Sequence, residues 1–263
     1  MAWYDWGEKS AAIPVVCVHG LTRNGRDFDW LAQGLAASGR RVVALDMPGR
    51  GESDWFDDAA RYEMRTYVKT VQSFMTTQGF AEVDWVGTSM GGMLGMVMAS
   101  LPQSPVRRLV LNDIGALIPK AALQEIASYV GHDEYFPTLR EVEIYLRRIH
   151  AGFGPLSDEQ WAHMARHGAK AADGGYRLRY DPKIASVFKS IVDKDADMWK
   201  LYDAVHAPTL VLRGADSGVL LRSTAVEMQN RGPKAKVVEI EGAGHAPALM
   251  SADQIEAVRA FLA

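Results

Sequence analysis

The sequence predicts an α/β fold with a mostly parallel central sheet flanked by helices, because short apolar runs alternate with amphipathic ones. Apolar runs of strand length, many of them β-branched, stand at residues 13–18, 42–45, 83–86, 108–111, 209–212 and 237–240. Segments with apolar residues at helical spacing separate several of these runs, which is typical of parallel strands joined by crossover helices. The alternation stops between residues 115 and 207, so we expect a separate element there.

The chain has 263 residues, which suits one large domain with a modest insertion. We expect residues 1–114 to form the first part of the core, residues 115–207 a helical cap inserted between core strands, and residues 208–263 the second part of the core. Helices are predicted within the cap, one of them beginning at Ser157, where Gln160 completes a capping-box pattern.

Charge and hydropathy exclude several classes of protein. The net charge of −3 argues against a broad basic surface for nucleic acid or anionic membrane. No apolar run reaches the ~18 residues that a membrane span requires. The N-terminus lacks the pattern of a signal peptide, so we expect a cytoplasmic protein. The single cysteine, Cys17, lies in an apolar run and is interpreted as a small buried hydrophobe. The oligomeric state is not disclosed by the sequence.

Residues 87–91 read Gly-x-Ser-x-Gly between a strand-like run and a helix-like run. This is the context in which a serine occupies a sharp nucleophile elbow. Gly87 and Gly91 fit that turn because side chains there would crowd the backbone. The same five residues also occur in Gly-rich turns with an idle serine, so the partners of Ser89 elsewhere in the chain decide its role.

A serine hydroxyl needs a base to remove its proton, and histidine suits this because its pKa lies near the working pH. His245 is the natural candidate, since it follows the last core strand in a loop that contains glycines. His19 is interpreted differently, as the organiser of a loop whose N–H at Leu21 faces an oxyanion. The N–H of Met90, the residue after the serine, is the expected second donor.

Together, four motifs resemble the α/β-hydrolase superfamily over nearly the whole chain. They are His19-Gly20, Asp46-x-Pro48-Gly49-x-Gly51-x-Ser53, Gly87-Thr88-Ser89-Met90-Gly91-Gly92 and Gly244-His245. Residues 18–28 resemble a bacterial branch of carboxylesterases, and this resemblance implies activity on simple esters, with some members acting on lactones or polyesters. A serine at the elbow argues against the dehalogenases and epoxide hydrolases of the superfamily, which carry aspartate there.

The acid is where the sequence departs from the pattern that the resemblance implies. The superfamily usually places it three or four residues after the glycine that ends the core strand at residues 209–212, which here is Gly214. Ser217 and Gly218 stand at those positions. We favour the nearby Asp216, which a small shift of the loop would bring to the histidine. The alternative is Asp113, just after the preceding strand. A dyad without an acid is the third possibility, because losing a triad acid lowers turnover by ~10⁴-fold without abolishing it.

Two further patterns are interpreted as structural. His163 and His167 have a spacing that can bind zinc, but no glutamate lies between them as a base, which favours an exposed polar helix face. Residues 193–197 resemble the start of a calcium loop, but later ligand positions are unsuitable, which favours a solvated acidic turn.

The sequence as a whole predicts a serine carboxylester hydrolase that works through an acyl-enzyme on a small-molecule ester. It needs no metal and no organic cofactor. A lactonase is the alternative within the enzymes, since opening a lactone uses the same groups. A non-catalytic binding protein of this fold is the alternative from another class, and the irregular position of the acid favours it.

Overall fold

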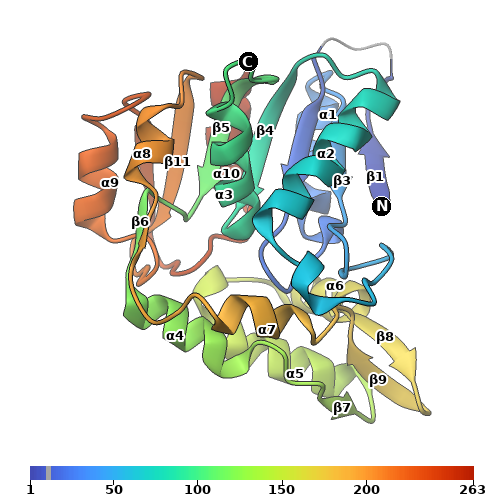
Figure 1. Ribbon diagram of the computed structural model, residues 1–263. Helices are drawn as coiled ribbons and strands as arrows, with labels where there is room; N and C mark the ends of the chain where they lie inside the picture. Colours follow the sequence, from blue (N-terminus) through green and yellow to red (C-terminus); the bar gives the residue numbers. More distant parts are fainter. Residues whose placement is uncertain (10–12) are drawn as a thin grey trace.

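The computed structural model describes residues 1–9 and 13–263. A seven-stranded sheet with the strand order β1-β3-β2-β4-β5-β11-β12 forms its centre (Figure 1). Only β1 runs antiparallel to its neighbour; the other adjacent strands pair in parallel. The strands are β1 (Trp3–Trp6), β2 (Val15–Val18), β3 (Val42–Leu45), β4 (Val83–Thr88), β5 (Val106–Asn112), β11 (Thr209–Gly214) and β12 (Lys236–Ile240). This confirms the predicted mostly parallel sheet.

Helices cover both faces of the sheet, because the central strands are apolar on both sides. In β2, Val16 and Val18 pack into one layer of the core, whereas Val15 and Cys17 pack into the other. The first layer lies under α2 (Met64–Gln78), α3 (Met90–Ala99), α8 (Trp199–Asp203) and α9 (Arg222–Met228). The second lies under α1 (Asp29–Ala37) and α10 (Ala252–Leu262). Short 3-10 helices η1 (Gly25–Phe28) and η2 (Ala59–Arg61) lie in the connections.

The segment between β5 and β11 holds most of the elements outside these layers, and Figure 1 shows α4, α5 and α7 with β7–β9 below the central sheet. Its elements are β6 (Leu117–Ile118), α4 (Lys120–Tyr129), β7 (Tyr135–Phe136), α5 (Leu139–Ile149), η3 (Ala151–Phe153), α6 (Asp158–Gly168), β8 (Ala169–Ala172), β9 (Gly175–Leu178), α7 (Ile184–Lys189) and β10 (Ala196–Asp197). Three of the strands form a small sheet in the order β7-β9-β8, which the sequence did not predict.

The residues at the ends of two helices explain where those helices begin and stop. The predicted capping box at the start of α6 is present, with Ser157 and Gln160 each accepting a backbone N–H of the other. At its far end, α2 stops at Gly79, whose φ of 69° lies in the left-handed region that glycine adopts without strain. Among the helices of residues 1–9 and 13–263, none combines the length and the apolar character that crossing a bilayer requires.

Candidate active site

Ser89 occupies a sharp turn between β4 and α3, and the backbone there is strained. Its φ of 51° and ψ of −113° lie outside the regions that serine normally adopts. Two glycines allow the close approach: a Cβ on Gly91 would overlap the carbonyl oxygen of Val18, and a Cβ on Gly87 would overlap the carbonyl group of Gly91. The turn therefore holds the Ser89 side chain at the carboxyl end of the sheet, as at a nucleophile elbow.

The imidazole of His245 links Ser89 to a carboxylate. Its Nε2 lies 3.0 Å from Oγ of Ser89, and its Nδ1 lies 2.8 Å from Oδ2 of Asp113. The loop that carries His245 follows β12 and contacts the segment between β5 and β11, since the N–H of Gly244 donates to the carbonyl oxygen of Gly152 at 2.7 Å. A histidine held in this way can take the proton of a serine and pass it to a leaving group.

Asp113 follows β5 and is fully buried. Its Oδ1 accepts the backbone N–H of Gly214 at 2.8 Å, and its Oδ2 accepts the hydroxyl of Ser217 at 2.6 Å in addition to facing His245. Three donors converge on the carboxylate, so its position is fixed by β11 as well as by its own strand. Buried charges are tolerated when they are hydrogen-bonded in this way.

The carboxylate beside His245 thus belongs to Asp113, which corrects the sequence-based preference for Asp216. After β11 the chain turns tightly, with the N–H of Ser217 donating to the carbonyl oxygen of Gly214. This turn directs the Ser217 hydroxyl inward and leaves Asp216 exposed. Among the described residues, the Asp216 carboxylate makes no hydrogen bond with His245.

Leu21 and Met90 border the same cavity as Ser89. Within residues 1–9 and 13–263, neither of their backbone N–H groups has a hydrogen-bond acceptor in the protein. Arg50, a residue that the sequence analysis did not single out, contacts both Leu21 and Met90. Its Nε donates to the carbonyl oxygen of Leu21 at 2.8 Å, and its Nη2 lies 3.4 Å from Sδ of Met90. Its place in the Pro-Gly-Arg-Gly loop was the only sequence signal for this role.

His19 lies behind the loop that contains Leu21. Its Nδ1 lies 2.7 Å from the carbonyl oxygen of Gly20, and its Nε2 accepts the N–H of Met47 at 3.0 Å. Burial lowers the pKa of His19 to about 3, so the ring is neutral at ordinary pH. Asp46 supports the same region, accepting the N–H groups of Gly25 and Glu52. His19 therefore contacts the loops rather than the serine.

The cavity above Ser89 has a volume of about 130 Å³ and mostly apolar walls. Several of its apolar side chains come from the segment between β5 and β11: Ile118, Leu123, Ile126, Phe153, Phe188 and Ile191. Besides Ser89 and His245, polar side chains in its wall belong to Thr22, Arg23, Asp27, Thr88, Tyr129 and His150. An apolar chain fits such a cavity, with its reacting group beside the serine.

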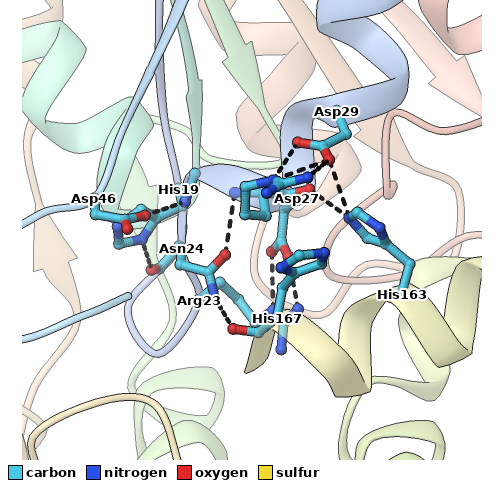
Figure 2. A network of polar contacts seen from close by, with 11 residues as sticks. His19, Arg23, Asn24, Asp27, Asp29, Asp46, His163 and His167 are labelled. Carbon is cyan, nitrogen blue, oxygen red and sulfur yellow. Dashed lines mark hydrogen bonds and ion pairs between the residues drawn. The ribbon is translucent and has the colours of Figure 1, made fainter. Parts of the chain in front are cut away.

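His163 and His167 do not form the exposed polar face that their spacing suggested. Figure 2 shows both rings near Asn24, Asp27 and Asp29, which lie just before, within and just after η1. Nε2 of His163 lies 2.9 Å from the carbonyl oxygen of Arg26, and the carbonyl oxygen of His167 accepts from the Asn24 amide at 3.0 Å. These contacts attach α6 to the core. Within the described ranges, no three histidine, cysteine or carboxylate side chains are grouped as a metal site.

A sequence model described as the alpha/beta hydrolase fold matches residues 13–250. The chain belongs to the α/β-hydrolase family. It is 40% identical over 264 residues, covering 97% of this chain and 90% of the relative, to a 3-hydroxybutyrate-oligomer hydrolase from Cupriavidus necator. An esterase from Mycobacterium tuberculosis is 26% identical, covering 98% of this chain and 84% of that protein.

The solved structure of a putative hydrolase from Rickettsia typhi superposes with a TM-score of 0.93 at 31% identity, covering 99% of this chain and 89% of the other. The predicted superfamily is therefore confirmed. As a member of the ester-hydrolysing α/β-hydrolase family, the chain is an enzyme that acts on ester bonds.

Proposed function

We propose that this α/β-hydrolase cleaves carboxylic esters through an acyl-enzyme on Ser89, with His245 as the base and Asp113 as the acid of the triad. The observation that carries the proposal is the continuous path of contacts from Asp113 to His245 to Ser89, at 2.8 and 3.0 Å, beside an apolar cavity. Serine triads are recognised by the geometry and the roles of their members rather than by sequence position, so these contacts support the assignment.

In the first step, Oγ of Ser89 attacks the ester carbonyl carbon while Nε2 of His245 takes the hydroxyl proton. The carbonyl oxygen becomes an oxyanion, which the N–H groups of Leu21 and Met90 stabilise. The tetrahedral intermediate then expels the alcohol, which receives the proton from His245. Asp113 orients the ring through Nδ1 and stabilises the imidazolium. Water then attacks the acyl-enzyme through the same steps, with His245 again as the base, and the carboxylic acid product is released.

The substrate class that we propose is an ester with a small or medium acyl chain. The apolar walls of the cavity support an acyl group of this size, and the relative from Cupriavidus necator, named for hydrolysis of 3-hydroxybutyrate oligomers, supports a hydroxyacyl ester. Lactones remain an alternative substrate because the same groups open them. The irregular acid position no longer favours a non-catalytic binding protein, since Asp113 contacts His245.

Hydrolysis of p-nitrophenyl butyrate by the protein and by its Ser89→Ala variant tests the proposal. We expect the substitution to lower kcat by about 10⁴-fold or more. Ser73→Ala, on the exposed face of α2, is the matched control and should leave kcat unchanged. Equal rates in the wild type and Ser89→Ala would remove Ser89 as the nucleophile. A wild type that cleaves neither esters nor a panel of lactones would contradict the proposal.

A further inference from the structure

A polar corner, formed by Arg23, Asp27 and His150, interrupts the apolar wall of the cavity above Ser89. Two hydrogen bonds join Arg23 to Asp27: Nε donates to Oδ2 at 2.8 Å and Nη2 to Oδ1 at 2.6 Å (Figure 2). Arg23 and His150 also border a second, smaller cavity together, so they are neighbours. None of the three contacts the serine in the proposed mechanism.

The position of His150 is set by packing at the end of α5. Its N–H donates to the carbonyl oxygen of Leu146 at 2.9 Å, and its ring stacks on Phe153 with centroids 4.4 Å apart. The adjoining turn packs on the loop of the catalytic histidine, because the carbonyl oxygen of Gly152 accepts the N–H of Gly244. His150 is therefore a fixed wall of the cavity, close to His245.

The imidazole of His150 has unused hydrogen-bonding capacity. Only 6% of the residue is exposed, and its ring nitrogens make no hydrogen bond with residues 1–9 or 13–263. They are not among the fully enclosed polar atoms without a partner, so they retain accessible surface. Most buried polar groups have a partner, so a buried ring that borders a cavity is suited to pair with a ligand. Burial and the charge of Arg23 hold the pKa of His150 well below 6.5, which leaves a neutral ring with one donor and one acceptor.

The charges of Arg23 and Asp27 indicate which functional group of a substrate could bind beside His150. The positive charge of Arg23 is already matched by the bidentate contact with Asp27. A carboxylate placed beside them would bury a third charge without a counterion, which is costly. A hydroxyl or an ester carbonyl brings no charge and can use the donor or the acceptor of a neutral imidazole.

We propose that His150 is a specificity-determining residue that hydrogen-bonds a neutral oxygen on the acyl chain, so that the enzyme prefers oxygenated acyl esters to plain alkyl esters. This inference rests on the proposed ester hydrolysis at Ser89. It assigns the polar corner to recognition of the acyl group rather than to the chemical step.

The test uses three p-nitrophenyl esters with four-carbon acyl groups: 3-hydroxybutyrate, butyrate and the succinate monoester. They share a leaving group and differ in whether the acyl chain carries a hydroxyl, nothing or a carboxylate. We expect the wild type to show the highest kcat/KM on 3-hydroxybutyrate. His150→Phe should lower the ratio of kcat/KM for 3-hydroxybutyrate to that for butyrate by about 10-fold, the loss expected for one hydrogen bond.

Two further variants sharpen the result. His150→Gln, which keeps a donor and an acceptor, should retain part of the preference. His132→Phe makes the same change at an exposed histidine with 51% of its side chain accessible, and should leave the ratio unchanged. Hydrolysis of butyrate by each variant reports that it is folded.

An unchanged ratio in His150→Phe, or a wild-type preference for the succinate monoester, would overturn the inference while leaving the esterase proposal intact. A wild type that is folded but cleaves none of the three esters would contradict the proposed function itself. The two failures are therefore distinguishable.

Discussion

The hydroxyl of Ser217 donates a 2.6 Å hydrogen bond to Oδ2 of Asp113, the same oxygen that lies 2.8 Å from Nδ1 of His245. The loop after β11, where the superfamily pattern places an acid, thus contributes a hydrogen-bond donor to Asp113 instead. Ser217 also accepts the N–H groups of Val219 and Leu220, so its hydroxyl orders the loop while it orients the carboxylate.

Replacing each aspartate in turn separates the two candidates for the acid. Asp113→Asn should lower kcat on p-nitrophenyl butyrate by about 10⁴-fold, because the amide cannot hold the imidazole in the required tautomer. Asp216→Asn is the matched control, and kcat should stay within about twofold of the wild type since the side chain is exposed. The opposite ranking of the two variants would contradict the assignment.

The guanidinium of Arg50 should contribute to turnover without touching the substrate. It bonds the carbonyl oxygen of Leu21 and the hydroxyl of Tyr67, at 2.8 and 2.6 Å, and a lysine cannot reproduce this fork. We expect Arg50→Lys to lower kcat about 10-fold or more with a smaller change in KM, because a displaced oxyanion donor acts on the transition state. Arg65→Lys, on an exposed position of α2, is the control. A change confined to KM would exclude this role.

The tight turn at the nucleophile should make Gly91 intolerant of any side chain. A Cβ there would overlap the backbone carbonyl oxygen of Val18, which cannot move without displacing β2. Gly91→Ala should therefore lower the free energy of unfolding by about 1–3 kcal/mol or more, as overpacking does. Gly218→Ala is the control, since a Cβ at that position meets open space. Thermal unfolding of both variants measures the difference, and equal melting temperatures would be inconsistent with it.

Acid should destabilise the protein through His19. Its pKa is lowered, chiefly by burial, from 6.5 to about 3, so below pH 6.5 the unfolded chain binds a proton that the native state does not. The stability that depends on a neutral His19 is complete above pH 6.5 and is lost as the pH falls toward 3. Between pH 7.5 and 5 this amounts to about 2 kcal/mol.

Urea unfolding at pH 7.5 and pH 5 measures this effect. The wild type should lose about 2 kcal/mol more than His19→Gln over that interval, because glutamine does not titrate. Parallel losses in the two proteins would show that the native ring is protonated as easily as the unfolded one. His167, whose pKa burial lowers to about 4, acts in the same direction in both proteins.

The core sheet was predictable from the sequence because its strands are short apolar runs, buried on both faces and separated by helices. Ser89 and His245 were expected to lie close together because both follow strands at one edge of the sheet. Oγ of Ser89 lies 3.0 Å from Nε2 of His245. Their catalytic roles stay predictions.

The choice between Asp216 and Asp113 was not predictable in the same way. It depends on which side chain the turn after Gly214 directs inward, and this is set by hydrogen bonds between β5 and β11 rather than by any periodic pattern. The contacts of His163 depend likewise on how α6 packs against a loop more than a hundred residues earlier in the chain.

Covalent labelling tests the central claim most directly. A fluorophosphonate reacts with an activated serine, and intact mass followed by peptide mapping locates the adduct. We predict one adduct per chain, on the peptide that contains Ser89, with loss of ester hydrolysis in step with labelling and no adduct in Ser89→Ala. Modification of a different residue, or hydrolysis that continues when Ser89 is fully modified, would contradict the acyl-enzyme account.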